Sequence, residues 1–426
     1  MTLGGHPTDP VPRAGRQEVS TGESSVAASR WTVLLLLSLA ELLGMSLWFT
    51  ASAVSPQLSQ LWDLSPGQAG SLTTAVQLGF VAGTAVAALL NLADVLPSRS
   101  YFAVSAIAAS VVNALLLAAP GYAPALGLRF LTGFFLAGVY PPAMKMIATW
   151  FRTGRGFAIG AIVGALTVGK AMPYLVNALT SVHYAAVITS TSAGALAAAA
   201  LVGLFYREGP EPFERRAFSW GLVGDVVRHR ETRLAIGGYL GHMWELYAVW
   251  TGASLFFHDY FMRSDAAAST VAVRAALAAF ALIAAGGAGA VLAGKWADRL
   301  GRENITIASM AVSGACCLLM GWLLAAPLWL VLPLALVWGF AVVADSAQFS
   351  ALVTEVGLKH AVGTALTLQT SLGFLLTAAS IAVMIDVQTR FGWGVAFSIL
   401  AIGPAVGIWQ MARLRTARLG TARRAD

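Results

Sequence analysis

A small set of ionisable and polar side chains interrupts the apolar stretches of this sequence, and these side chains are the first candidates for chemistry. They are Glu41, Arg129, Tyr140, Lys170, His242, Glu245, Asp345 and Gln348. An ionisable side chain in a lipid-spanning segment costs about 2.5–3.5 kcal/mol, so it usually faces a cavity or a partner. Carboxylates in such places can carry protons, and buried cations can hold an anion. The set is suited to binding protons and a small charged ligand.

The two glutamates have the same two interpretations. Glu41 lies near the middle of one apolar stretch, and Glu245 lies in another with His242 three residues earlier on the same helical face. Each glutamate either binds protons or a ligand, or is a structural carboxylate bonded to a neighbouring helix. The run from His242 to Glu245 is not an HExxH motif, and Cys316 and Cys317 have no metal-ligand companions, so we expect no metal site and no cofactor.

The cations and the polar run at Asp345 also leave alternatives open. Arg129 either takes part in coupling or extends its side chain to the membrane edge. Lys170 is too deep for that, and we expect it to pair with a carboxylate or an anionic ligand. Asp345 can bind a proton, pair with a cation or brace a gate, and Gln348 follows it in the same run. Tyr140 is an aromatic residue that can shape a pocket.

The composition places these residues in a membrane. The 426 residues are 58% hydrophobic and only 11% charged, whereas a soluble domain carries about 25% charged residues. Apolar stretches of about 20 residues recur, each long enough to cross a hydrocarbon core of about 30 Å. We therefore predict an all-α polytopic membrane protein with twelve transmembrane helices, at residues 31–54, 67–91, 101–119, 123–149, 156–178, 184–206, 234–257, 271–296, 304–325, 328–352, 361–385 and 392–412.

The polar segments divide the chain. Residues 1–30 are rich in Gly, Pro, Ser and Thr and are predicted to be a disordered cytoplasmic tail. A polar linker at 207–233 separates a first six-helix bundle, 31–206, from a second, 234–412. Residues 413–426 form a basic cytoplasmic tail.

The basic residues predict the orientation. Of the 27 Lys and Arg residues, 21 lie in the tails and in alternate loops on one side, and three lie in loops on the other side. By the positive-inside rule, both termini are cytoplasmic, in the plasma or inner membrane. The net charge of +7 is explained by this bias, so it gives no reason to expect a nucleic-acid partner. The lipid bilayer and a small solute are the expected partners, and we expect a monomer.

The two halves of the chain are related by an internal repeat. Asp94 and Asp298 are 204 residues apart, and the same separation relates Glu41 to Glu245. A repeat of half the chain length is typical of transporters built from two homologous bundles.

The segment from Gly294 to Glu303 carries a resemblance to a known family. It reads Gly-Lys-Trp-Ala-Asp-Arg-Leu-Gly-Arg-Glu, which is similar to the conserved loop of the major facilitator superfamily, G-x-x-x-D-R-x-G-R-[RK], and departs from it only at Glu303. A degenerate copy of this loop lies in the first half, at Leu90–Arg99. The resemblance implies a cytoplasmic gate that is latched by the loop and its copy. The gate residues would be Asp94, Arg99, Gly294, Asp298, Arg299, Gly301 and Arg302.

The resemblance also implies the family's fold, with two pseudo-symmetric six-helix bundles, and its alternating-access mechanism. Arg129, followed by Gly133, is similar to a second family motif that implies a role in proton coupling. The run from Gly138 to Pro142 resembles branches that include nitrate/nitrite and cyanate permeases.

We expect from this a secondary active transporter that is proton-coupled and carries a small organic or inorganic anion. Proton-driven efflux of amphipathic compounds is the alternative. A membrane-embedded sensor or enzyme is the remotest reading, because the polar residues contain no catalytic motif.

Overall fold

The structure is a computed structural model, and it describes residue 1 and residues 17–151, 154–180, 183–210, 219–263 and 267–425. The described residues form helices and no strand, which confirms the all-α prediction. The helices of the first half are α1 (Gln17–Met45), α2 (Thr50–Ala53), α3 (Ser55–Trp62), α4 (Pro66–Leu89), α5 (Leu92–Val95), α6 (Ser98–Ala114), α7 (Tyr122–Leu136), α8 (Tyr140–Ala148), α9 (Arg155–Leu179) and α10 (Tyr184–Phe205).

The predicted linker contains a short helix, α11 (Val223–Arg228). The helices of the second half are α12 (Arg230–Met262), α13 (Ala268–Leu300), α14 (Arg302–Met320), α15 (Leu328–Ala344), α16 (Ser346–Val356), α17 (Val362–Ser398) and α18 (Ile402–Ala425). The predicted linker covers 207–233, and its residues 211–218 lie outside the described part of the chain.

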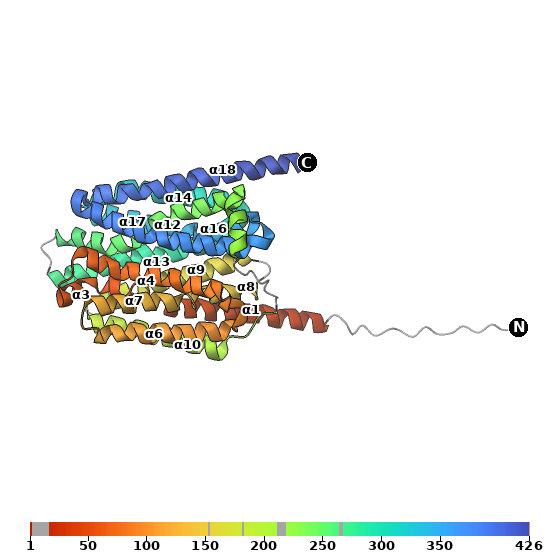
Figure 1. The fold of residues 1–426 in the computed structure, drawn as a ribbon, viewed down its shortest axis with the longest axis horizontal. Helices are drawn as coiled ribbons and strands as arrows, with labels where there is room; N and C mark the ends of the chain where they lie inside the picture. The colour runs from red at the N-terminus through yellow and green to blue at the C-terminus, as the bar shows by residue number, and fades with distance from the viewer. Residues whose placement is uncertain (2–16, 152–153, 181–182, 211–218, 264–266, 426) are drawn as a thin grey trace.

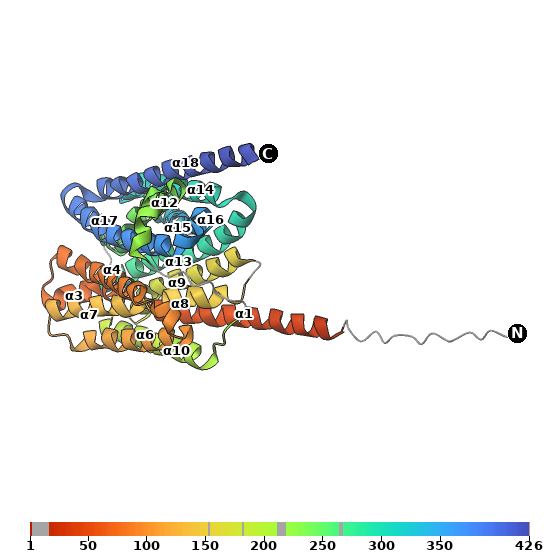
Figure 2. The same ribbon diagram turned by 45° about the vertical axis from the view of Figure 1, so that its right-hand side comes forward.

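The long helices run side by side in two groups (Figures 1 and 2). One group holds α1 to α10 and the other holds α12 to α18. The groups meet along two seams, where α9 packs against α13 and α4 packs against α17. Helix α1 begins and helix α18 ends at the same end of the bundle (Figure 1). We call this the terminal end and the opposite one the far end.

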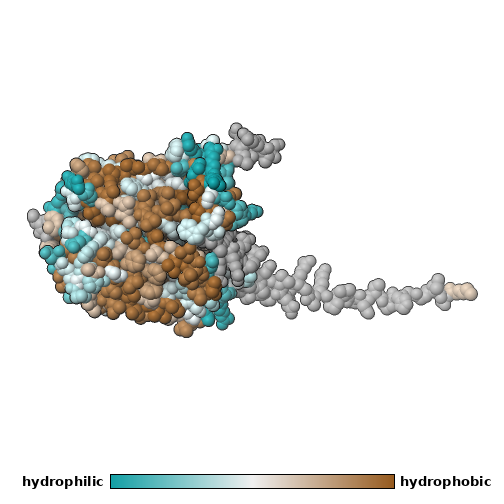
Figure 3. Space-filling model, viewed as in Figure 1, coloured by the Kyte–Doolittle hydropathy of each residue, from teal (hydrophilic) through white to brown (hydrophobic). Residues whose placement is uncertain are grey.

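The surface has an apolar band between two hydrophilic ends (Figure 3). Within the described residues, nine helical segments are long and apolar enough to cross a membrane. One of these, Lys359–Leu419, contains both α17 and α18. Helices α1 and α12 account for two further predicted spans by position. The count of twelve stays a prediction.

Three of the predicted continuous spans are interrupted. The span at 31–54 breaks after Met45, the span at 123–149 breaks between α7 and α8, and the span at 328–352 breaks at Asp345. Proline at the start of α8 explains one break, since proline lacks the N–H that a continuing helix needs. These breaks fall beside the residues that line the centre of the molecule.

The boundaries at both ends of the chain also differ from the prediction. Helix α1 begins at Gln17, inside the segment 1–30 that was predicted to be disordered, and residues 2–16 lie outside the described part. Helix α18 continues to Ala425, so the tail predicted at 413–426 extends a helix. The predicted loop before the last span is reduced to a non-helical residue, Gly392, with φ of 80°. Only a residue without a side chain adopts this conformation at little cost.

Candidate functional site

A cavity of about 90 Å³ lies between the two halves at the centre of the bundle. Both halves contribute to it through α1, α4, α8 and α9 on one side and α12, α15, α16 and α17 on the other. Its polar and aromatic lining residues are Trp48, Phe80, Tyr140, Thr167, Lys170, Tyr239, His242, Tyr247, Trp250, Ser346, Ser350, Thr370 and Phe374. We call this space the central cavity.

Lys170 brings a cation into the central cavity. Its side chain is 4% exposed, and its ammonium donates a hydrogen bond of 2.5 Å to the hydroxyl of Tyr247 in the other half. The ammonium also lies 4.2 Å from the ring centre of Trp48, 4.9 Å from that of Tyr247 and 5.4 Å from that of Trp250. These distances are within the range of cation–π attraction. Lys170 therefore connects the two halves through its hydrogen bond to Tyr247 and through the ring faces of Tyr247 and Trp250.

Glu41 lies beside Lys170 without a hydrogen-bond donor. The side chain is fully buried, and neither carboxylate oxygen has a hydrogen-bond partner in the described part of the chain. It interacts electrostatically with Lys170 and with Tyr140. Helices α1 and α9 approach closely here, since a Cβ on Gly169 would lie 2.8 Å from the Cα of Leu42. A buried carboxylate without donors is costly as an anion unless a cation compensates it.

His242, Asp345 and Ser346 form a second polar group at the cavity wall. The Nδ1 atom of His242 lies 2.9 Å from Oδ1 of Asp345, and its Nε2 atom lies 3.0 Å from the hydroxyl of Ser346. Asp345 and Ser346 occupy the break between α15 and α16. His242 and Ser346 line the central cavity, whereas Asp345 lies behind the imidazole. Asp345 is thus close enough to form an ion pair with His242 when the imidazole is protonated.

Glu245 lies inside the second half and not among the cavity-lining residues. Its carboxylate accepts hydrogen bonds from the indole of Trp338 at 2.7 Å, the hydroxyl of Ser313 at 2.9 Å and the thiol of Cys317 at 3.1 Å. These donors come from α14 and α15. The repeat mates Glu41 and Glu245 therefore have opposite surroundings, because one has no donor and the other has three.

Arg129 is buried and does not extend to the membrane edge. Its guanidinium donates to the carbonyl oxygens of Leu47 and Trp48, at 3.0 Å and 2.6 Å, and to Oδ1 of Asn113 at 2.9 Å. The two carbonyls belong to the break between α1 and α2, where helical hydrogen bonds are incomplete. Arg129 holds this break and thereby positions Trp48 over Lys170.

A network at the terminal end of the bundle contains two of the predicted gate residues, Asp298 and Arg302. Arg302 lies 3.6 Å from Asp298 and 2.6 Å from Glu355, and it donates a hydrogen bond of 2.7 Å to Gln348. Gln348 is therefore part of this network and not of the central cavity. Arg418 of α18 lies 2.6 Å from the carboxylate of Glu303, the residue that departs from the family pattern.

The segment Gly294–Glu303, which we call the gate loop, also contacts the first half. A Cβ on Gly156 would lie 2.8 Å from a carboxylate oxygen of Asp298, and one on Gly294 would lie 2.6 Å from the carbonyl oxygen of Gly156. Only glycine permits this approach of α9 to α13. Gly301 ends α13 with φ of 86°, a conformation that glycine adopts at little cost.

The remaining predicted gate residues are Arg299, Arg99 and Asp94. Arg299 and Arg99 are exposed. The side chain of Asp94 lies outside the described residues, although its backbone belongs to α5.

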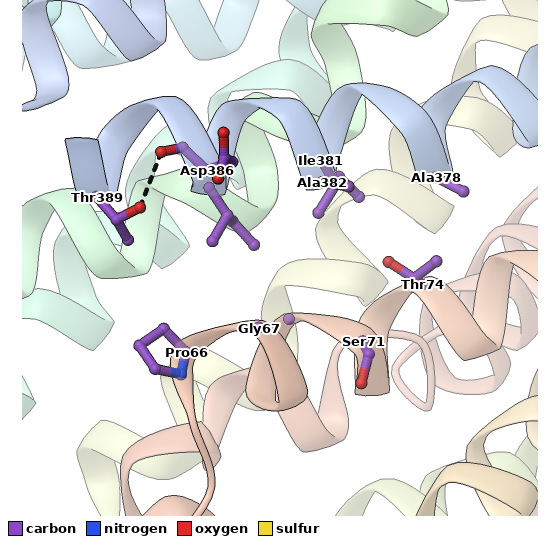
Figure 4. Close-up of a pocket in the computed structure, with 11 residues that line it drawn as sticks. Pro66, Gly67, Ser71, Thr74, Ala378, Ile381, Ala382, Asp386 and Thr389 are labelled. Carbon is purple, nitrogen blue, oxygen red and sulfur yellow. Dashed lines mark hydrogen bonds between the residues drawn. The ribbon is translucent and has the colours of Figure 1, made fainter. Parts of the chain in front are cut away.

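A larger crevice of about 440 Å³ opens at the far end, between α4 and α17 (Figure 4). Its walls include Pro66 and Thr74 on α4 and Ala378 and Asp386 on α17. Further along the same two helices, toward the centre, are cavity residues Phe80 and Phe374, whose ring centres are 4.7 Å apart. This ring pair, which we call the phenylalanine pair, separates the crevice from the central cavity.

Sequence reasoning missed the phenylalanine pair and Tyr239. Aromatic residues in apolar helices are usually packing residues, and nothing in the spacing of these three marks them as different. Within the described part of the chain, no three or more His, Cys, Asp or Glu side chains are grouped to hold a metal ion.

Comparisons with known proteins agree with this architecture. Residues 36–381 match the family model described as the Major Facilitator Superfamily. The fold is similar to a solved structure of a point mutant of the nucleoside transporter NupG, with a TM-score of 0.68, 14% sequence identity, and coverage of 90% of this chain and 99% of that chain. At this identity the likeness concerns the fold alone. A search of curated proteins gives no significant match.

Proposed function

The chain belongs to the major facilitator superfamily and is a secondary transporter, not an enzyme, and on that basis we propose that it carries a small anion together with a proton by alternating access. The observation that carries the proposal is Lys170, a buried cation in the central cavity that is bonded across the two halves and lies next to a carboxylate without donors. We further propose a monomer with both termini in the cytoplasm, so that the terminal end is the cytoplasmic end.

The anion would bind to Lys170. In this structure the ammonium is bonded to a neutral hydroxyl, Tyr247, which a substrate carboxylate or other anion can displace. A charge-assisted hydrogen bond is roughly twice as strong as a neutral one, so the exchange is favourable. Because Tyr247 belongs to the second half, displacing it also loosens a contact between the halves.

The proton would bind to Glu41, and the coupling follows from the net charge of the buried site. A site that holds Lys170 as a cation and the anion is neutral only when Glu41 is protonated. An empty site is neutral only when Glu41 is ionised and compensates Lys170. The two half-loaded sites carry a net charge, and burying an uncompensated charge costs several kcal/mol. The closed conformation therefore forms with both anion and proton, or with neither.

The two ends of the bundle supply the gates in this proposal. The cytoplasmic gate consists of the Arg302 network and the close contact of Asp298 with Gly156. The phenylalanine pair closes the far end beneath the crevice. Opening either gate while the other stays shut gives the central cavity access to one side at a time.

Efflux of amphipathic cations is the second candidate, and the ring faces around the ammonium of Lys170 favour it. Rings in this arrangement also bind ligand cations. A ligand cation would, however, have to displace Lys170 from its place over Trp48, so the resident cation opposes this function.

Proteoliposomes with a trapped pH dye test the proposal. A gradient of a transported anion should drive protons in the same direction as the anion, and Glu41→Gln should abolish this signal. Glu245→Gln is the matched control, because it makes the same chemical change at the repeat mate outside the cavity, and it should retain the signal. Lys170→Met should lose anion flux altogether. Anion flux without proton movement in the wild type would contradict the coupling, and undiminished flux in Lys170→Met would contradict the anion site.

A further inference from the structure

The lining of the central cavity around Lys170 bears on which anion is carried. The ammonium has one hydroxyl partner, Tyr247, it lies over the faces of Trp48, Tyr247 and Trp250, and the buried carboxylate of Glu41 is its electrostatic partner. The rings are themselves packed together, with ring centres of Trp48 and Tyr247 5.6 Å apart and those of Tyr247 and Phe374 5.4 Å apart. An anion that reaches Lys170 thus meets one cation and a wall of rings.

Such a wall discriminates between anions. The face of an aromatic ring carries negative charge density and its edge carries positive charge density. A small inorganic anion at Lys170 would lie against negative faces, and it would exchange a complete hydration shell for few donors, which is costly. An anion with its own aromatic ring needs to be dehydrated only at its charged group, and its ring edge or face can pack against the wall.

The other end of the cavity is polar. His242, Ser346 and Ser350 line it, so a ligand that extends from Lys170 past the rings ends among hydroxyl and imidazole groups. The cavity volume of about 90 Å³ is well below the ~300–1,000 Å³ of pockets for drug-sized ligands. The ligand therefore has about one ring.

We infer that the central cavity selects a small monocarboxylate that carries an aromatic ring, with the carboxylate at Lys170 and the ring packed against the cluster of Trp48, Tyr247 and Phe374. This inference rests on the proposed function, because it names the class of anion that the same site would take. The single carboxylate follows from the neutrality of the closed site, in which one cation compensates one anion.

Calorimetric titration of the purified full chain in detergent tests the inference with four probes: benzoate, cyclohexanecarboxylate, acetate and nitrate. Benzoate and cyclohexanecarboxylate have the same charge and nearly the same size, so their difference reports aromaticity. Benzoate should bind about tenfold more tightly than cyclohexanecarboxylate, which is the factor that one good ring contact supplies. Acetate and nitrate should bind more weakly than both.

A pair of variants on one helix assigns the preference to the cavity. Phe374→Leu removes a ring from the lining and should reduce the preference for benzoate over cyclohexanecarboxylate to about threefold or less. Phe397→Leu makes the same change in α17 at a buried ring that packs against Trp338 outside the lining, and it should retain the tenfold preference. An equal loss of preference in both variants would overturn the assignment.

The outcomes separate the inference from the proposed function. Acetate or nitrate binding as tightly as benzoate, with binding lost in Lys170→Met, would overturn the aromatic class and leave the anion transporter standing. Equal affinities for benzoate and cyclohexanecarboxylate would do the same. Binding of benzyltrimethylammonium that is tightened by Lys170→Met would overturn both, as would the failure of all four anions to bind.

Discussion

Replacing Glu245 by leucine separates a structural role for this carboxylate from a role in transport. The side chain accepts three hydrogen bonds inside the second half, and the shortest of them, at 2.7 Å, comes from the indole of Trp338. Leucine fills a similar volume but accepts none of them. Ser313 keeps a second acceptor, the carbonyl oxygen of Met310 at 3.4 Å, and a thiol is a weak donor, so the indole N–H is the group left without a partner.

The expected cost follows from that single orphaned donor. A buried donor without an acceptor costs about 1–3 kcal/mol, so Glu245→Leu should lower the free energy of unfolding by about 2 kcal/mol. At about 2 °C for each kcal/mol in a long chain, the apparent melting temperature should fall by about 4 °C. Removing the donor as well should restore stability, because a pair of apolar groups replaces both partners. The double variant Glu245→Leu, Trp338→Phe should therefore regain at least half of the loss.

Thermal unfolding of the purified protein, followed by light scattering and tryptophan fluorescence, measures both effects. Trp338→Phe alone provides the fourth corner of the double-mutant cycle. Additive losses in the double variant would mean that the indole does not depend on Glu245. A Glu245→Leu protein that is folded but has lost proton coupling would refute the division of roles between Glu245 and Glu41.

Three further predictions concern the gates. Asp298→Asn should slow transport with little loss of folded protein, because the latch loses its charge. Uptake rates normalised to the amount of folded protein measure this effect, and an unchanged rate would count against the latch. Gly294→Val should force α13 away from Gly156 and favour a cytoplasm-open form, which would increase thiol labelling of a cysteine placed in the cavity from the cytoplasmic side. Phe80→Ala should disrupt its contact with Phe374 and increase labelling of the same cysteine from the opposite side, whereas unchanged labelling would remove the phenylalanine pair from the gate.

Local features of the chain were predictable from the sequence. The gate loop can be recognised from ten consecutive residues, because it depends on Gly301 ending a helix and on Gly294 permitting the close approach of another helix. The apolar periodicity also predicted the all-α fold, because each lipid-facing helix satisfies its own backbone hydrogen bonds. The family resemblance is confirmed by the match over residues 36–381, whereas the resemblance to nitrate and cyanate permeases stays a prediction.

The roles of individual buried charges were not predictable, because their partners are distant in the sequence. The repeat predicts that Glu41 and Glu245 are equivalent, yet Ser313 and Trp338 are 68 and 93 residues from Glu245. Gln348 lies in a polar run that suggests a cavity, and it bonds Arg302 instead. Position along a helix gives depth in the membrane, but it does not say which helix provides the partner.

The helix breaks were missed for a related reason. Membrane-spanning stretches are recognised by hydropathy averaged over a long window, and that average does not mark the breaks within Tyr122–Ala148 or within Leu328–Val356, although the latter contains the polar run at Asp345. The backbone groups exposed at the break after Met45 are satisfied by Arg129, a residue in another helix. Hydropathy alone does not show that a side chain from another helix satisfies these backbone groups.

Labelled-anion transport by Glu41→Gln in proteoliposomes tests the proposed coupling most directly. A neutral side chain at this position resembles the protonated, loaded site permanently, so the loaded site still closes while the empty site keeps an uncompensated Lys170. The variant should therefore exchange labelled for unlabelled anion at a rate near that of the wild type, while net uptake driven by an acid-outside pH gradient is lost. Net, pH-driven uptake that persists in Glu41→Gln, or exchange that disappears together with uptake in a folded protein, would contradict the account.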